Sequence, residues 1–353
     1  MVDYLIIGSG LAGVSFAKEL LANDKSFCVI SDDSQQSSQV AGALYNPVIL
    51  KRFTPVWKAD EQLLKLHETF GYYEKFFGAS LLEDLPVYRR FASVEEQNGW
   101  FEASDNPKLN RYLNTDLKSN TFISIDADFR FGKVNDTGRL AISKLISLFK
   151  THFQKKNLFI SDTFDYRLLK IELGGFVYKD VIAKNVIFCD GYGLMKNPYF
   201  NYLPLRGTKG ELLVIKAPEL KVDVVIKSAG FIIPLGNDLY KIGATYNHDD
   251  KNNIPSKKGR QELLDKIAGL IKCDFEIVNQ LAGVRPTVAD RRPLVGEHPA
   301  HKNMYILNGL GTRGVMIGPY AADILYKHIY NAADIPSEMN VIRFKKRWLK
   351  ANA

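Results

Sequence analysis

The stretch that decides the fold is VDYLIIGSGLAGVSFAKELL at residues 2–21, followed by FCVISDD at residues 27–33. Residues 2–7 form a short apolar run typical of a buried strand, and the apolar positions after the glycines have helical spacing. A second apolar strand, residues 27–30, ends at an acidic pair. This order of strand, glycine turn, helix, strand and acid predicts a dinucleotide-binding unit.

Each glycine of the turn has its own physical task. Gly8 allows the tight turn off the strand, Gly10 lets the backbone approach a pyrophosphate, and Gly13 permits close packing of helix on strand. The N–H groups and positive dipole at the start of the helix then attract phosphate. The candidates for binding the ribose are Ser31, Asp32 and Asp33. Asp32 stands nineteen residues after Gly13, near the expected spacing.

A second glycine turn lies near the other end of the chain. Gly309, Gly311 and Gly314 also follow an apolar run and precede a helical pattern. A helix and Pro336, rather than a strand, accompany Asp334, so this is not a second dinucleotide unit. A glycine turn that enters a helix is still an anion site, and in a flavoprotein it stabilises charge on the reduced flavin. A turn made glycine-rich by packing is the alternative.

The composition is that of a globular protein. Of 353 residues, 46% are hydrophobic and 24% charged, which suffices for a sizeable core. No apolar run is long enough to span a bilayer and no secretion signal begins the chain, so the cytoplasm is the expected location. The three cysteines lie far apart and the six histidines form no ligand pattern, so no metal site is predicted.

The formal net charge is +8, and much of it lies at the C-terminus. The cations there are Arg343, Lys345, Lys346, Arg347 and Lys350. Charge patterning favours the solvated face of a terminal helix. The alternative is contact with an anion such as RNA.

Four motifs follow one another along the chain: GSGLAG at 8–13, SQVAGAL at 38–44, GVRPT at 283–287 and GLGTRGV at 309–315. In this order they resemble the D-amino-acid oxidase, glycine oxidase and sarcosine oxidase family of FAD enzymes. The resemblance implies an α/β fold in which a Rossmann-like FAD-binding domain interleaves with an antiparallel-sheet substrate-binding domain, as in glycine oxidase. The expected bounds are 1–60, 135–206 and 282–353 for the first, and 61–134 and 207–281 for the second.

The resemblance also implies how FAD is held. Leu11 and Ala12 would lie at the pyrophosphate, the backbone near Phe164 at the adenine, and residues 309–315 over the flavin ring. The full predicted set is Gly8, Gly10, Leu11, Ala12, Gly13, Ser31, Asp32, Asp33, Ser37, Ser38, Ala41, Gly42, Ala43, Phe164, Gly191, Gly309, Leu310, Gly311, Thr312, Arg313, Gly314 and Val315. Relatives with covalent flavin use a cysteine near the position of Gly283, so non-covalent FAD is expected here.

Five residues are candidates for the chemistry. Arg285 matches the family's carboxylate-binding arginine and has the fork geometry for that task; a structural ion pair is the alternative. Arg313 would bind substrate or stabilise the reduced flavin. Lys241 would assist the reaction with oxygen, unless it is an outward-facing strand lysine. Tyr45 and Tyr246 would line the substrate pocket, with simple packing as the alternative.

The implied activity is that of an FAD-dependent oxidoreductase acting on CH–NH or CH–NH2 donors. Its substrate would be a small carboxylate-bearing amine, an amino acid or N-substituted glycine, oxidised by hydride transfer to the flavin. Oxygen or another electron acceptor would reoxidise the flavin. A flavin-binding protein without turnover is an alternative from another class.

A more specific resemblance gives a further alternative. Residues 42–45, 243–246 and 309–314 resemble the FAD oxidase domain of the bifunctional enzymes that modify the tRNA wobble uridine. The activity would then be oxidation of a carboxymethylaminomethyl group on tRNA, and tRNA would be a partner. Because the chain starts at the FAD fingerprint, no counterpart of their methyltransferase domain is expected.

Overall fold

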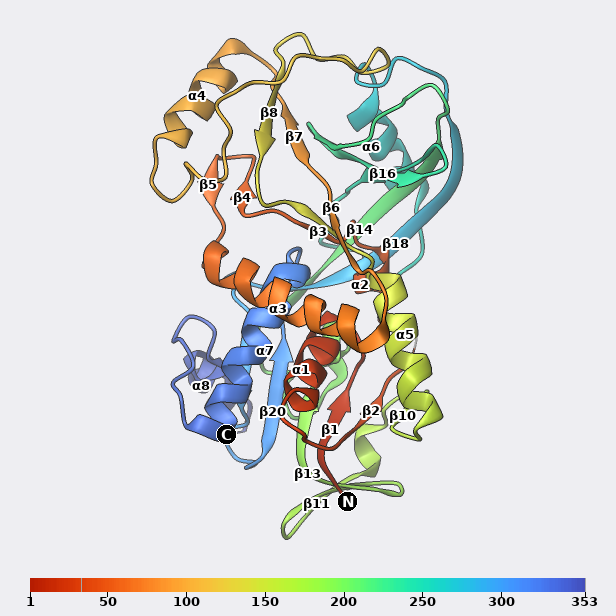
Figure 1. The fold of residues 1–353 in the computed structure, drawn as a ribbon. Helices are drawn as coiled ribbons and strands as arrows, with labels where there is room; N and C mark the ends of the chain where they lie inside the picture. Colours follow the sequence, from red (N-terminus) through yellow and green to blue (C-terminus); the bar gives the residue numbers. More distant parts are fainter. Residues whose placement is uncertain (33, 353) are drawn as a thin grey trace.

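The computed structural model describes residues 1–32 and 34–352 and contains a large, mainly parallel sheet (Figure 1). Its strand order is β10-β2-β1-β13-β12-β11, with β20 beside β13 and β19 beside β20. The strands are β1 (Val2–Ile7), β2 (Phe27–Ile30), β10 (Phe159–Ile160), β11 (Leu169–Glu172), β12 (Gly175–Tyr178), β13 (Val181–Phe188), β19 (Leu294–Glu297) and β20 (Met304–Asn308). Strands β10, β2, β1, β13 and β20 run parallel, as in a dinucleotide-binding sheet.

Strand β1 is buried on both faces, which explains its unbroken apolar sequence. Tyr4 and Ile6 belong to one hydrophobic cluster, whereas Leu5 and Ile7 belong to another on the opposite side. Helices α1 (Leu11–Leu21), α3 (Ala59–Phe77) and α7 (Gly314–Asn331) pack against one another in front of the sheet (Figure 1). The apolar residues of α1 and α7 belong to the same cluster as Tyr4 and Ile6.

The second large sheet has the order β18-β14-β17-β16-β15-β7-β8. Its strands are β7 (Val87–Arg90), β8 (Phe131–Val134), β14 (Leu205–Lys216), β15 (Val225–Lys227), β16 (Phe231–Gly236), β17 (Leu239–Gly243) and β18 (Glu276–Val288). All neighbours are antiparallel except β15 and β7. The predicted antiparallel sheet is therefore confirmed, with one parallel pair.

Strands β14 and β18 connect the two halves of the molecule. They pair from Leu205↔Val288 to Lys216↔Glu276, with a register shift between Val214 and Ile215. Figure 1 shows both strands running from the upper sheet down towards the lower one. The α/β fold class is confirmed. The domain bounds stay a prediction, and β18 crosses the expected boundary at residue 282.

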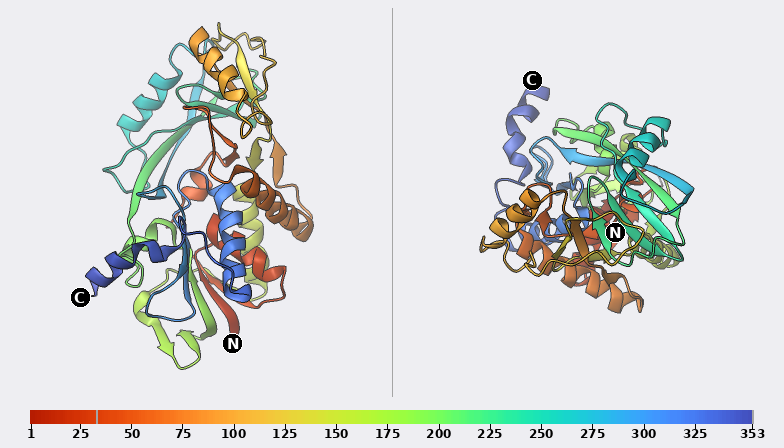
Figure 2. Two further views of the ribbon diagram at one scale, coloured as in Figure 1. Left: turned by 90° about the vertical axis from the view of Figure 1, so that its left-hand side faces the viewer. Right: turned by 90° about the horizontal axis from the view of Figure 1, so that it is seen from above.

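The remaining elements are short. The helices are α2 (Ser37–Val40), α4 (Val94–Ser104), α5 (Ile142–Lys155), α6 (Lys257–Ile267) and α8 (Lys345–Ala351). The strands are β3 (Leu44–Tyr45), β4 (Val48–Ile49), β5 (Thr54–Pro55), β6 (Leu82–Asp84) and β9 (Gly138–Leu140). Helix α8 projects from the body of the molecule at the C-terminus (Figure 2). None of the described helices has the length and apolar character needed to cross a membrane.

Candidate cofactor and substrate site

A cavity of about 640 Å³ lies at the carboxyl ends of β1, β2 and β13, where the second sheet approaches them. In open α/β sheets ligands bind at this edge. Most of the predicted site residues line it: Gly8, Gly10, Leu11, Ala12, Ser31, Asp32, Ser37, Ser38, Ala41, Gly42, Ala43, Phe164, Gly191, Tyr246, Arg285, Leu310, Gly311, Thr312, Gly314 and Val315. Asp33 lies outside the described residues. The lining contains none of Gly13, Gly309, Arg313, Lys241 and Tyr45.

The glycine turn has no room for side chains. Gly8 has a φ of +102°, and an added Cβ would lie 2.5 Å from the carbonyl oxygen of Cys189. A Cβ on Gly13 would lie 2.0 Å from the carbonyl oxygen of Gly8, so this glycine sets the approach of α1 to β1 behind the cavity. Helix α1 starts at the cavity wall, where the Leu11 N–H donates to Ser38 Oγ at 3.3 Å. A pyrophosphate fits this positive helix end.

Asp32 offers an ionised carboxylate at the end of β2. It accepts hydrogen bonds from the Ser34 N–H (3.0 Å), Ser34 Oγ (2.6 Å) and Thr163 Oγ1 (2.8 Å). Burial alone would raise the pKa of Asp32, but these hydrogen bonds outweigh it and lower the pKa. Ser31 stabilises the glycine turn instead, because its Oγ accepts a hydrogen bond from the Ser9 N–H at 3.2 Å. The arrangement favours Asp32 over Ser31 as the ribose acceptor.

Asp190, next to the predicted Gly191, also lines the cavity and was not among the predicted residues. Asp190 follows β13 and is 8% exposed. Its carboxylate accepts hydrogen bonds from Asn308 Nδ2 (2.8 Å), Tyr166 OH (3.0 Å) and Asn197 Nδ2 (3.1 Å). Burial raises its pKa to about 6 in spite of these donors. An acid directly after a buried parallel strand, before a glycine, was the signal available in the sequence.

Arg285 is a cation at the wall of the cavity whose neighbours supply no negative charge. Its guanidinium lies 4.6 Å from the centre of the Tyr246 ring, and Nη1 donates to the carbonyl of Thr245 at 3.2 Å. Neither contact supplies negative charge, and burial lowers the pKa of this side chain. Among the described residues no carboxylate forms an ion pair with it. Such a group is suited to receive a carboxylate from a ligand.

Gly210 makes the position of Arg285 accessible, and the sequence analysis missed it. On β14 it lies opposite Gly283, beside the strand position of Arg285. A Cβ added to Gly210 would lie 2.0 Å from Arg285 Nη2. The guanidinium therefore occupies the space that a side chain on β14 would fill. A glycine directly before a strand glutamate carries no sequence signal for this role.

Arg313, Lys241 and Tyr45 lie behind the cavity wall. Arg313 begins α7 and donates from Nη1 to the Asn46 carbonyl at 3.0 Å. Lys241 points inward, with Nζ 3.2 Å from the Ala41 carbonyl oxygen, which corrects the alternative of an outward-facing lysine. Tyr45, on β3, is 1% exposed and belongs to the hydrophobic core rather than to a substrate pocket.

Gly309 and Tyr246 frame the remaining part of the site. Gly309 has a φ of +73°, and an added Cβ would lie 2.5 Å from Val288 Cγ2, so it shapes the turn before α7 from outside the lining. Tyr246 is 59% exposed and therefore stands at the mouth of the cavity. The fold and this cavity are suited to a dinucleotide placed between a parallel sheet and an antiparallel sheet.

Residues 164–327 match the family described as DAO, FAD dependent oxidoreductase. The matched segment is a little under half of the chain and is similar to FAD-dependent oxidoreductases, and FAD is the cofactor that this similarity implies. The residues fit this cofactor: a glycine turn at the start of α1, an ionised acid after β2 and a second glycine turn before α7.

Relatives of two kinds are found. The tRNA 5-methylaminomethyl-2-thiouridine biosynthesis bifunctional protein MnmC of Aromatoleum aromaticum is 27% identical over 42% of this chain and 26% of its own length. Glycine oxidase of Geobacillus kaustophilus is 30% identical over 33% of this chain and 32% of its own length. The matches thus span only about a quarter to a third of these relatives.

Solved structures share the fold over nearly the whole chain. Glycine oxidase from Bacillus cereus has a TM-score of 0.74 at 18% identity, covering 95% of this chain and 96% of its own. Iminodiacetate oxidase from Chelativorans has a TM-score of 0.76 at 17% identity, covering 96% and 99%. L-proline dehydrogenase from P. horikoshii has a TM-score of 0.77 at 13% identity, covering 98% of both chains.

Proposed function

We propose that the protein oxidises the C–N bond of a small amine that carries a carboxylate. The observation that supports this most is Arg285, a half-buried guanidinium at the cavity wall whose neighbours are a ring and a carbonyl rather than an acid. A buried cation without an anionic partner is costly. A substrate carboxylate would remove that cost and would fix the amine relative to the cofactor.

The chain's own residues bind and orient the substrate. When bound, FAD supplies the acceptor for the hydride that leaves the substrate carbon. The fork of Arg285 holds both carboxylate oxygens, and Tyr246 limits where the guanidinium can turn. Loss of the hydride from a neutral amine yields an iminium ion, which water hydrolyses to a carbonyl compound and an ammonium ion. Arg313, buried at the start of α7, adds positive potential near the same place.

The test is anaerobic bleaching of the flavin absorbance with a panel of substrates. The panel contains glycine, sarcosine, D-amino acids, proline, and tRNA bearing carboxymethylaminomethyl-uridine. Bleaching by one or more free amines supports the proposal. Bleaching by the tRNA alone eliminates it in favour of RNA modification, and bleaching by none of them favours a flavin-binding protein without turnover.

The tRNA alternative has observations of its own. The MnmC proteins resemble this chain, and the α8 cations are exposed, without an ion pair among the residues that the structure describes. These cations are Lys345, Lys346, Arg347 and Lys350. Unpaired surface cations attract the phosphates of a nucleic acid. The half-exposed Tyr246 would then meet the modified base at the mouth of the cavity.

The third alternative, flavin binding without turnover, would be favoured by a closed pocket or by an ion pair on Arg285. The cavity is open enough for a ligand, and the described residues supply no such ion pair. The proposal also includes oxygen or another electron acceptor as the oxidant of the reduced flavin. It places the protein in the cytoplasm. Stopped-flow reoxidation with oxygen and cell fractionation test them.

A further inference from the structure

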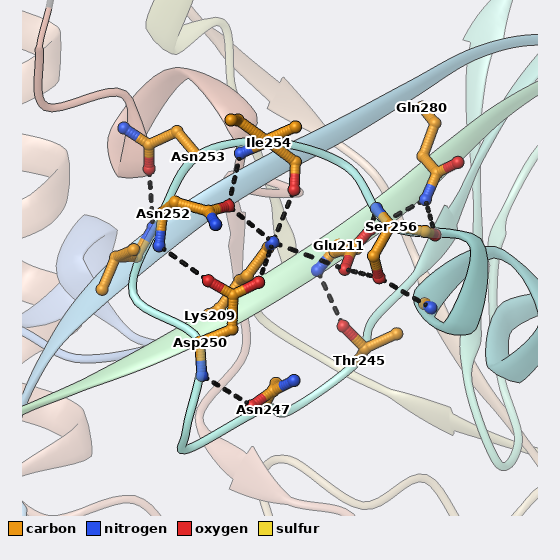
Figure 3. Close-up of polar contacts among 12 residues, drawn as sticks. Lys209, Glu211, Thr245, Asn247, Asp250, Asn252, Asn253, Ile254, Ser256 and Gln280 are labelled. Carbon is orange, nitrogen blue, oxygen red and sulfur yellow. Dashed lines mark hydrogen bonds and ion pairs between the residues drawn. The ribbon is translucent and has the colours of Figure 1, made fainter.

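A buried lysine holds the segment Asn247–Ser256, which joins β17 to α6 and is called the strap below (Figure 3). Lys209 on β14 is 1% exposed. Its Nζ donates to Asp250 Oδ2 at 2.6 Å, to Asn252 Oδ1 at 2.8 Å, and to the carbonyl of Ile254. The ammonium therefore gathers three strap residues around one point.

Glu211, two positions further along β14, fixes the end of the strap. It accepts hydrogen bonds from the Ser256 N–H and Oγ, both at 2.7 Å, and from Gln280 Nε2 at 2.7 Å. Ser256 in turn caps α6 through its Oγ. The strap begins at Asn247, which exchanges backbone hydrogen bonds of 2.9 Å with Lys209. Figure 3 shows both anchors on one stretch of β14.

These anchors give the strap one strongly preferred position. Buried charges are tolerated only when each has partners of good geometry. The hydrogen-bond acceptors of Lys209 Nζ come from the strap, and a further ion-pair partner, Glu211 on β14, lies 3.9 Å away. Hydrogen bonding to Lys209 lowers the pKa of Asp250. Moving the strap would strip the ammonium of these acceptors, so movement is costly.

The strap reaches across to the parallel sheet. Asn253 Nδ2 donates to the Ser34 carbonyl at 3.0 Å, while its Oδ1 accepts the Val284 N–H at 3.3 Å. Ser34 is the residue whose N–H and Oγ hold the carboxylate of Asp32. Lys251, another residue of the strap, lines the cofactor cavity. A continuous set of contacts therefore runs from Lys209 to the acid expected at the ribose.

We propose that the strap completes the FAD site: Asn253 is a positioning residue that holds the Asp32 loop in place and so slows the release of the cofactor. Lys209 acts indirectly, because it keeps Asn253 within hydrogen-bonding distance of Ser34. The strap belongs to the antiparallel half of the chain, so it would couple the substrate sheet to the dinucleotide end of FAD.

The test measures FAD release from the holoenzyme. Holoenzyme is diluted into a large volume of buffer that contains no free FAD, so that released FAD does not rebind. The rise in flavin fluorescence then gives the release rate. Asn253→Ala and Asn253→Leu remove both hydrogen bonds, the second with little change in volume. Asn98→Ala, at an exposed position of α4, is their control. Asp250→Asn removes the ion pair to Lys209, and Asp274→Asn, at an exposed position outside the strap, makes the same charge change.

We expect both Asn253 variants and Asp250→Asn to release FAD about tenfold faster than the wild type, which corresponds to the loss of one or two hydrogen bonds. The two control variants should release it at the wild-type rate. Release at the wild-type rate from both Asn253 variants would overturn the proposal, even with a lower melting temperature, because the strap would then serve only folding. Should Asp250→Asn fail to fold, the Asn253 variants still decide.

Discussion

Arg285 has a ring, a carbonyl and a glycine as its neighbours, and this combination makes it available to a ligand. The ring of Tyr246 covers one face of the guanidinium, and Thr245 takes one of its donors. Gly210 provides the space in which the fork lies. The remaining donors lie at the wall of the cavity, where a carboxylate can meet two of them at once.

Two substitutions of Arg285 distinguish the contribution of its positive charge from that of its forked shape. Arg285→Ala should lower kcat/KM for the amine substrate by a hundredfold or more, because a buried charge pair of about 3 kcal/mol or more is lost. Arg285→Lys keeps the charge but loses the fork, so it should restore only part of the loss. Steady-state kinetics gives both values. Equal kcat/KM in wild type and Arg285→Ala would exclude a carboxylate contact.

Gly210→Ala tests the same site from the neighbouring strand. A methyl group 2.0 Å from Nη2 forces the guanidinium out of its place. We expect kcat/KM to fall by about tenfold or more, since a small misplacement of a binding group is costly. The double variant Gly210→Ala/Arg285→Ala should be no worse than Arg285→Ala alone. Additive losses in this cycle would mean that Gly210 acts through something other than Arg285.

Asp190 gives the folded protein a distinct pH dependence. Its pKa is raised by burial from 3.8 to about 6. Between these values the folded state keeps a proton that the unfolded chain has released. The free energy of unfolding therefore decreases as pH rises through this window, by about 3 kcal/mol in total. Asp190→Asn removes this dependence, which urea unfolding at several pH values measures.

The comparison of wild type with Asp190→Asn is essential, because His298 acts in the opposite direction. Burial lowers the pKa of His298 to about 4, so its contribution to stability rises with pH over nearly the same window. Both proteins contain His298, so its contribution drops out when the free energy of unfolding of one is subtracted from that of the other. If the difference in the free energy of unfolding between wild type and Asp190→Asn did not vary with pH, the raised pKa of Asp190 would be contradicted.

At the scale of elements, the unit β1–turn–α1 shows how a short sequence determines a binding geometry. Alternate residues of β1 pack on opposite faces, which holds the strand between two apolar layers. Gly13 then brings α1 close enough for its first N–H groups to reach the cavity. The close approach depends on one missing methyl group.

Two helical glycines make a matched pair for testing this. Gly13→Ala places a Cβ 2.0 Å from a backbone oxygen, so it should displace α1 and weaken FAD binding strongly. Gly71→Ala, within α3, meets no atom within 4 Å. It should instead stabilise the protein by about 0.5–1 kcal/mol. Flavin fluorescence titration and thermal unfolding measure the two effects. Unchanged FAD affinity in Gly13→Ala would contradict the geometry.

On the scale of the whole molecule, FAD would be a shared ligand of the two large sheets. The cavity is lined by Gly10 and Ser38 from one half, and by Gly210, Phe231 and Arg285 from the other. A ligand that touches both halves stabilises their arrangement. The strap makes a second connection between them through Asn253.

Removal of FAD should therefore lower the melting temperature, and added FAD should restore it in a concentration-dependent way. At a free concentration of a hundred times Kd, the stabilisation expected from mass action is about 2.7 kcal/mol. Differential scanning fluorimetry or calorimetry gives the shift. Riboflavin lacks the diphosphate and should produce no shift at the same concentration. A melting temperature independent of FAD would argue against a cofactor held between the sheets.

The sequence by itself determined the dinucleotide unit and the two glycine turns. Their signals are local: a buried strand, glycines at set spacing and an acid after the next strand impose backbone geometry within about thirty residues. For the same reason, most of the predicted cofactor residues line the cavity. The antiparallel sheet was implied by the family resemblance of the four motifs.

Only the tertiary structure decided which side chains meet. Gly210 lies under Arg285, Asp190 is buried among three donors, and Asn253 reaches Ser34, although each partner is distant in sequence or lies on another strand. Tyr45, predicted for the pocket, belongs to the hydrophobic core. Burial and long-range contact set these positions, and neither is encoded in the spacing of neighbouring residues.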